Sequence, residues 1–210
     1  MTRLSPAILV PDLAEYRAHL AIVRQLTNRF QLDVIDGEFV DNKTVQPEEI
    51  QPLGGELKMD LHLMVNDPVR YAEAAVRLRP NLTIFQYEVP GDLQAAIARM
   101  KKTNLKVGIA LNPKTDLEVL NEFEGLLSQV LIMAYPAGFA AQEFQPKVLR
   151  RVEAVRDMLP YVEIGLDGGV SQETVKAIAD AKVDIAYVNS ALFGADDPLS
   201  RYSELMGAML

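Results

Sequence analysis

Residues 58–87 read KMDLHLMVNDPVRYAEAAVRLRPNLTIFQY, and this stretch contains one complete repeat of the pattern that decides the fold. The apolar runs near Lys58–Leu63 and Thr83–Tyr87 are short and predict β-strands. Between them, Asp67 and Pro68 precede the helical segment VRYAEAAVRL. An Asp side chain accepts free N–H groups at a helix start, and Pro fits the first turn. We therefore predict a strand, a helix and a second, parallel strand.

The same alternation continues in both directions over the 210 residues of the chain. Eight strands with eight crossovers close naturally into a barrel, whereas an open doubly wound sheet of that size usually needs a longer chain. The predicted fold class is therefore α/β, a single (β/α)8 TIM barrel, with residues 1–210 forming one domain. The other predicted strands lie near Ala7–Leu9, Phe30–Val34, Lys106–Ala110, Val130–Met133, Tyr161–Leu166 and Ile185–Val188.

Most of the predicted helices begin at a residue type that favours a helix start. Ser, Thr and Asp can cap the free N–H groups there, and Pro is tolerated in the first turn. The predicted starts are Asp12, Asp67, Asp92, Thr115, Pro146, Ser171 and Pro198, and Pro47 opens a shorter helix after the second strand.

The composition excludes several classes of function. A net charge of −8 argues against a nucleic-acid surface, because neutralising phosphates requires clustered Lys and Arg. The absence of cysteine excludes disulfides, thiolate nucleophiles and Cys-based zinc or iron–sulfur sites. The start MTRLSPAILVPDL has no signal-peptide pattern, and no apolar run reaches membrane-spanning length. We expect a cytoplasmic protein that binds neither nucleic acid nor membrane.

In such a barrel the reactive groups come from the C-terminal ends of the strands and the loops that follow. Gln31 and Asp33 lie two residues apart at the end of the second predicted strand, so alternation puts both side chains on one face. His62 lies at the end of the third strand, in DLHLMV, and Asp167 at the end of the seventh, in GLDGG. Two carboxylates and one imidazole are thus predicted at the barrel mouth.

At these positions the chain resembles the ribulose-phosphate 3-epimerase family, and the resemblance covers almost its whole length. Members of that family hold a divalent metal with two His and two Asp, and both Asp exchange protons. Carried over by position, Asp33 and Asp167 are the two carboxylates and His62 is one imidazole, whereas Gln31 stands where the family has its other His. The matching segments are SPAIL, LDVIDGEFV, DLHLMV, GIALNPKT, IMAYPAGFAAQEF, LDGGV and NSALFG.

The resemblance implies an epimerase that acts on a phosphorylated keto-sugar of the ribulose 5-phosphate and xylulose 5-phosphate type. Inverting a carbon next to a ketone requires a base on one face and an acid on the other. Asp33 and Asp167 are therefore the predicted catalytic residues. The predicted metal ligands are Gln31, Asp33, His62 and Asp167, for zinc, manganese, iron or cobalt.

Several positions depart from the family pattern. An amide oxygen is a poorer ligand than imidazole for zinc-like ions, so we expect Gln31 to weaken or abolish metal binding. Ala7 replaces the serine of the first strand, and Ala140 and Ala141 add methyl groups to a loop that is glycine-rich in the family. Substrate and phosphate binding is predicted for Gly138, Gln142, Gly168, Gly169, Asn189 and Ser190.

Two other functions stay open. One is a non-catalytic phosphosugar-binding barrel with a decayed metal site, which Gln31, Ala7 and the altered loop favour. The other is an epimerase or isomerase for a different sugar phosphate, since a fold does not fix a function. The related decarboxylase motif D-x-K-x-x-D is excluded, because Ile35 and Glu38 take the places of its Lys and second Asp. The predicted partners are a small phosphorylated keto-sugar and, as among the relatives, further copies of the chain in a homo-oligomer.

Four further residues carry weaker expectations. Asp36 is expected to cap its own loop by accepting from nearby backbone amides. His19 lies in an amphipathic helix and is expected at the surface. Met64 and Met133 resemble apolar residues that cover the family's site, although methionine is also ordinary core filler.

Overall fold

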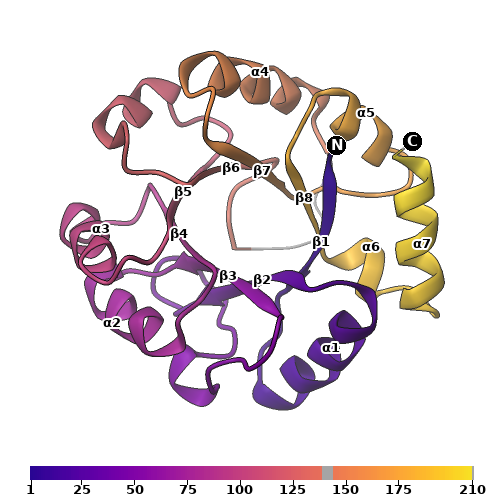
Figure 1. Ribbon diagram of the computed structural model, residues 1–210, viewed down its shortest axis with the longest axis horizontal. Helices are drawn as coiled ribbons and strands as arrows, with labels where there is room; N and C mark the ends of the chain where they lie inside the picture. The colour runs from indigo at the N-terminus through magenta and orange to yellow at the C-terminus, as the bar shows by residue number, and fades with distance from the viewer. Residues whose placement is uncertain (139–143, 210) are drawn as a thin grey trace.

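The computed structural model describes residues 1–138 and 144–209. Its strands form a closed parallel barrel in chain order, in which β1 pairs with β8 (Figure 1). This confirms the predicted (β/α)8 fold. The strands are β1 (Arg3–Ile8), β2 (Arg29–Ile35), β3 (Lys58–Met64), β4 (Leu82–Gln86), β5 (Val107–Leu111), β6 (Gln129–Met133), β7 (Glu163–Asp167) and β8 (Ile185–Val188).

Helices surround the barrel on its outside (Figure 1). None of those in the described part of the chain is long and apolar enough to cross a membrane. The α-helices are α1 (Leu13–Leu26), α2 (Pro68–Leu78), α3 (Leu93–Lys101), α4 (Leu149–Met158), α5 (Val175–Asp180), α6 (Ser190–Phe193) and α7 (Pro198–Ala208). Within residues 1–138 and 144–209 there are also three short 3-10 helices, η1 (Pro47–Glu49), η2 (Leu117–Phe123) and η3 (Pro146–Val148).

Two of the predicted helix starts are wrong. Asp116, not Thr115, caps η2 by accepting from a backbone N–H, and the segment that follows is a 3-10 helix. At Ser171 the backbone N–H donates to the Thr174 hydroxyl 2.9 Å away, which forms a turn, so α5 begins only at Val175. The caps of α1, α2 and α3 are confirmed, since each accepts from backbone N–H groups, and they are Asp12, Asp67 and Asp92.

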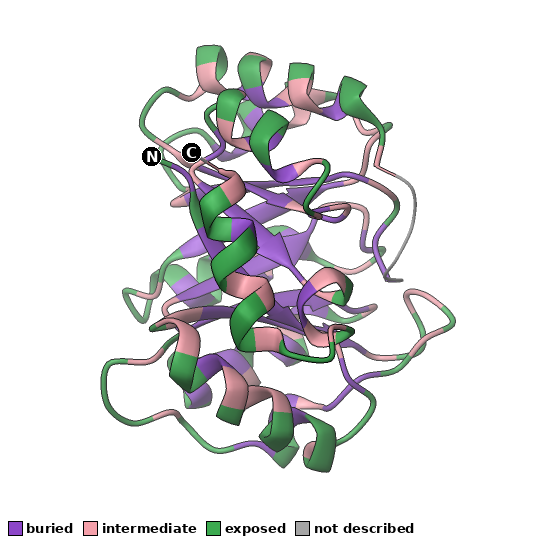
Figure 2. Cartoon of the chain, turned by 90° about the vertical axis from the view of Figure 1, so that its right-hand side faces the viewer, coloured by how far each residue is buried: buried purple, intermediate pink, exposed green. Residues whose placement is uncertain are grey.

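Alternation along the strands divides the apolar residues into two clusters. Ile35, Met64 and Leu131 belong to a cluster inside the barrel, whereas Leu32 and Leu63 face outward into the larger cluster that the helices cover. Figure 2 shows the result, with buried strands at the centre and the exposed residues mostly in loops and on the outer faces of helices. Burial of both strand faces leaves only the two ends of the barrel open to polar side chains.

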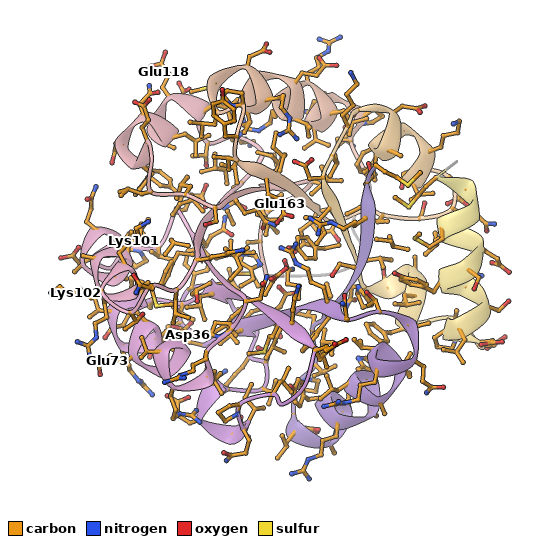
Figure 3. All side chains as sticks on the ribbon, viewed as in Figure 1. Asp36, Glu73, Lys101, Lys102, Glu118 and Glu163 are labelled. Atoms are coloured by element: carbon orange, nitrogen blue, oxygen red, sulfur yellow. The ribbon has the colours of Figure 1, made fainter. Side chains whose placement is uncertain are left out.

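A network of charged groups closes the N-terminal end of the barrel. Arg29 donates from Nε to Asp60 at 2.6 Å and from its two terminal nitrogens to Glu163 at 2.9 and 2.7 Å. Asn81 and Tyr187 also donate to the fully buried Asp60, at 2.7 and 2.8 Å. Figure 3 labels Glu163 inside the ring of helices. The network therefore satisfies two acids at the end of the barrel opposite the predicted site.

We predict that Arg29→Met lowers the free energy of unfolding by about 3–5 kcal/mol, because it leaves Asp60 buried without its cationic partner. Urea unfolding measures the loss. Arg201→Met is the matched control, since Arg201 pairs with Glu204 on an exposed helix and should lose less than about 1 kcal/mol. Equal losses in the two variants would contradict the role given to Arg29.

Candidate active site

The three predicted site residues Asp33, His62 and Asp167 meet at the C-terminal end of the barrel. The register of β2 against β3 places Asp33 directly beside His62, and Asp167 ends β7 across the barrel mouth. One ligand atom from each residue lies within 4.8 Å of the others. Asp33 and His62 are buried and Asp167 is partly buried. Strands far apart in the sequence therefore bring together the groups that the strand-end rule singled out.

Gln31 links the two carboxylates. Its amide nitrogen Nε2 donates to Asp33 Oδ1 at 2.9 Å and to Asp167 Oδ2 at 2.6 Å. His62 Nδ1 lies 3.0 Å from Asp33 Oδ1 and 3.8 Å from Asp167 Oδ2. The amide and the imidazole thus reduce the repulsion between two acids that would otherwise face each other in a poorly solvated space.

The electrostatics of the site follow from burial and from the closeness of the acids. Burial, together with the negative charge of Asp33, raises the pKa of Asp167 to about 7. Burial also acts to lower the pKa of His62, but the hydrogen bond and charge of Asp33 and the charge of Asp167 outweigh it, so that the pKa of His62 is raised. Asp167 therefore takes up a proton more readily than an ordinary carboxyl group.

The donor set fits a divalent metal at three positions. The separations of His62 Nδ1 from the two acids, 3.0 and 3.8 Å, are those of ligands that each bond one ion at about 2.0–2.2 Å. Gln31 now presents its nitrogen to the acids, and its buried Oε1 has no hydrogen-bond partner among the described residues. A half-turn of the amide would exchange these atoms and point the oxygen toward an ion. Gln31 is therefore compatible with a fourth ligand only in that rotated form.

Apolar side chains cover the acids. Met64 and Met133, which are nearly fully buried, line a cavity of 30 Å³ beside Asp33 and Asp167, together with Leu9, Tyr135, Gly138 and Asn189. A space of this size holds about one water molecule. A sugar must displace part of this cover to reach the acids, and unbranched methionines can change rotamer readily.

A second cavity lies beside the first, over the loop after β7 and the start of α6. It has a volume of 320 Å³, and its lining includes Gly169, Ser171, Ser190 and Ala191. Backbone amides at the start of α6 and around Gly169 can donate to an anion there. The structure thus brings the predicted phosphate residues Gly169 and Ser190 together.

The other predicted phosphate residues have different surroundings. Gly168 has φ +102°, and a Cβ at this position would lie 2.8 Å from the Tyr135 ring, so glycine is required there by the turn and its packing. Gly138 and Asn189 line the smaller cavity with the acids, and Asn189 donates to the Ala7 carbonyl at 2.7 Å. Gln142 lies outside the described residues, as do Ala140 and Ala141.

A profile of the ribulose-phosphate 3 epimerase family matches residues 3–193. The chain belongs to this family. The ribulose-phosphate 3-epimerase of Schizosaccharomyces pombe is 31% identical over 214 residues, which cover 99% of this chain and 94% of the relative. That of Bacillus subtilis is 30% identical over 217 residues, covering 99% of this chain and 100% of the relative. Both relatives are thus isomerases, and each aligns with this chain over nearly its whole length.

Solved structures agree on the fold. The 3-hexulose-6-phosphate synthase of Salmonella typhimurium superposes with a TM-score of 0.73, covering 99% of this chain and 98% of the other. Its sequence is only 14% identical, so this likeness concerns the barrel and not the activity.

Among the residues with weaker expectations, Asp36 behaves as predicted. Its Oδ1 accepts from the backbone N–H groups of Glu38 and Phe39, both at 2.9 Å, and its Oδ2 accepts from that of Asn66 at 2.6 Å. It therefore joins the loop after β2 to the loop after β3. His19 is half-buried rather than fully exposed, because its ring stacks on Phe193 at a centroid distance of 4.0 Å.

Two polar residues behind the site escaped the sequence interpretation. Gln86, at the end of β4, is fully buried, and its Oε1 lies 3.0 Å from His62 Nε2. Glu88 accepts from Gln86 and from the backbone N–H of Asn112. A signal existed, since Gln86 is a polar residue at a strand end on the inward face with Ile84.

We predict that Gln31→His tightens divalent metal binding by at least roughly tenfold, since an imidazole replaces an amide that now donates to both acids. Calorimetric titration with Zn²⁺ or Mn²⁺ compares the two proteins. His62→Gln is the matched control and should weaken binding, because it removes the remaining imidazole. Equal affinity of the unmodified chain and Gln31→His would show that residue 31 is not at a ligand position.

Proposed function

We propose that this protein epimerises the carbon next to the ketone of a phosphorylated keto-sugar, of the ribulose 5-phosphate and xylulose 5-phosphate type. The observation that carries the proposal is the meeting of Asp33 and Asp167. They come from β2 and β7, yet a single amide nitrogen, Gln31 Nε2, contacts both. Two carboxylates held on different sides of one small space are what a base and an acid acting on opposite faces of a carbon require.

The proton transfer uses these residues in turn. One carboxylate removes the proton from the substrate carbon, and the other returns a proton to the opposite face. Without a bound cation, burial and the charge of Asp33 raise the pKa of Asp167 to about 7, which favours Asp167 as the acid. Asp33, beside His62, then acts as the base, and the roles exchange in the reverse reaction.

The charge that develops on the substrate oxygens needs stabilisation. Asp33, His62 and Asp167 would hold a divalent cation, which supplies Lewis-acid stabilisation of that negative charge. Gln31 contributes a neutral donor that can face the acids or, with its amide rotated, offer an oxygen. The buried Met64 and Met133 keep water away from the reacting carbon.

The phosphate of the substrate would occupy the cavity at Gly169 and Ser190. This cavity shares Tyr135 with the smaller cavity that contains the acids, so one ligand can extend from one to the other. Its volume of 320 Å³ is ample for a phosphate group, and its backbone amides supply donors in a protein with a net charge of −8. Such a phosphate would orient the sugar with its ketone toward Asp33 and Asp167.

A non-catalytic phosphosugar-binding barrel is the second candidate, and Gln31 favours it. The amide nitrogen takes up one oxygen of each acid, which are the atoms a cation would bind. In that function the phosphate cavity would bind a ligand without turnover. The two candidates differ in whether the acids exchange a proton with the bound sugar.

The homo-oligomer and the cytoplasmic location stay predictions. A relative from Oryza sativa that is 32% identical over 203 residues is a cytoplasmic isoform, which supports that location for this chain.

We predict that Asp33→Asn and Asp167→Asn each lower kcat for epimerisation of ribulose 5-phosphate by at least about 10³-fold, because an amide cannot accept the proton. A coupled assay for xylulose 5-phosphate measures the rate, and circular dichroism checks the fold. Asp180→Asn is the matched control, since Asp180 is exposed on α5 and should leave kcat unchanged. Retention of activity by either active-site variant would remove that residue from the mechanism.

A further inference from the structure

We propose that Glu88 and Gln86 are positioning residues that keep a proton on Nε2 of His62 and so reserve Nδ1 for the two acids. The inference goes beyond the proposed function, and it rests on that function only in giving His62 a place in the site. It is carried by a chain of hydrogen bonds that runs from the loop after β4 to the barrel mouth.

His62 is held from both sides of its ring. Its Nδ1 faces Asp33 Oδ1 at 3.0 Å, and its Nε2 faces Gln86 Oε1 at 3.0 Å. Both His62 and Gln86 are fully buried, so these contacts fix the ring orientation without help from bulk water. Which nitrogen carries the proton then depends on which end of the Gln86 amide faces the ring.

Glu88 fixes the orientation of that amide. A carboxylate accepts hydrogen bonds, so the atom of Gln86 that contacts Glu88 Oε2 must be the donor Nε2. The opposite orientation would place the Gln86 oxygen against the Glu88 oxygen and lose the bond. Oε1 of Gln86 therefore faces His62, and a bond between Oε1 and the ring requires a proton on Nε2.

Glu88 is itself held in place. Its Oε1 accepts from the backbone N–H of Asn112 at 2.9 Å and from the Thr115 hydroxyl. The side-chain oxygen of Asn112 in turn accepts from the backbone N–H of Ala137, also at 2.9 Å. The chain of bonds thus ties the loops after β4, β5 and β6 to His62, and each member has one possible direction of donation.

The consequence concerns the nitrogen that faces the acids. In the neutral imidazole with its proton on Nε2, the lone pair lies on Nδ1, which points at Asp33 and Asp167 and is free for a cation. In the imidazolium form, Nδ1–H donates to Asp33 and Nε2 still donates to Gln86. Nε2 is protonated in both forms, so Nδ1 is the ring nitrogen left to face the two acids.

The test is nitrogen-15 NMR of the imidazole rings of the full chain, recorded without substrate and with chelator present. The chain has two histidines, and the spectrum of His19→Gln assigns His62. We expect the chemical shift of a protonated nitrogen at His62 Nε2. An unprotonated Nε2 in the unmodified chain would overturn the proposal, whether or not any variant folds.

Glu88→Gln then tests the part played by Glu88. A glutamine at 88 can donate to Gln86, which allows the Gln86 amide to turn and present its nitrogen to the ring. We expect Nε2 to lose its proton and Nδ1 to gain one. Glu118→Gln is the matched control, since Glu118 is exposed on η2 and lies at the periphery in Figure 3, and it should leave the spectrum unchanged. A folded Glu88→Gln with an unchanged His62 spectrum would overturn the role of Glu88.

This experiment separates the two proposals. A chain with a protonated His62 Nε2 that does not epimerise any sugar phosphate contradicts the proposed function and leaves the positioning of His62 standing. An active chain with an unprotonated Nε2 supports the proposed function and contradicts the positioning of His62.

Discussion

Two carboxylates held a few ångströms apart in a buried barrel mouth are the constraint on which the rest of the site depends. Asp33 and Asp167 repel each other, and burial removes the water that would screen them. Hydrogen-bond donors offset this repulsion. Gln31 donates to both acids, and His62 lies between the acids and Gln86. Burial, together with this repulsion, raises the pKa of Asp167 to about 7.

The two ends of the barrel treat their acids differently. At the N-terminal end, burial acts to raise the pKa of Glu163, but Arg29 outweighs it and holds that pKa below its usual value. Arg29 pairs with both Glu163 and Asp60, although burial outweighs this pairing at Asp60 and leaves the pKa of that acid raised. At the C-terminal end the acids meet the Gln31 amide, which can rotate, and the His62 imidazole, which can take up or give up a proton. This contrast matches the general division of such barrels into a stabilising end and a reactive end.

The sequence predicted the barrel and the meeting of Asp33, His62 and Asp167, because strand alternation and the strand-end rule depend only on spacing. It did not predict that the nitrogen of the Gln31 amide, and not its oxygen, faces the acids, since a sequence does not show how a side-chain amide is oriented. The link from Gln86 to Glu88 was missed as well, because it depends on side-chain orientations that the sequence does not show. The helix start at Thr115 was wrong because the neighbouring Asp116 supplies the cap, and that at Ser171 was wrong because its backbone N–H donates to Thr174 in a turn.

The central claim is that the two acids exchange protons with a carbon next to a ketone. Incubation of the unmodified chain with ribulose 5-phosphate in heavy water, with Zn²⁺ or Mn²⁺ supplied, tests it most directly. The account predicts deuterium at that carbon in the xylulose 5-phosphate formed and, with time, in the recovered ribulose 5-phosphate. Neither epimerisation nor deuterium uptake with this or other pentulose and hexulose phosphates would contradict it and would favour a binding protein.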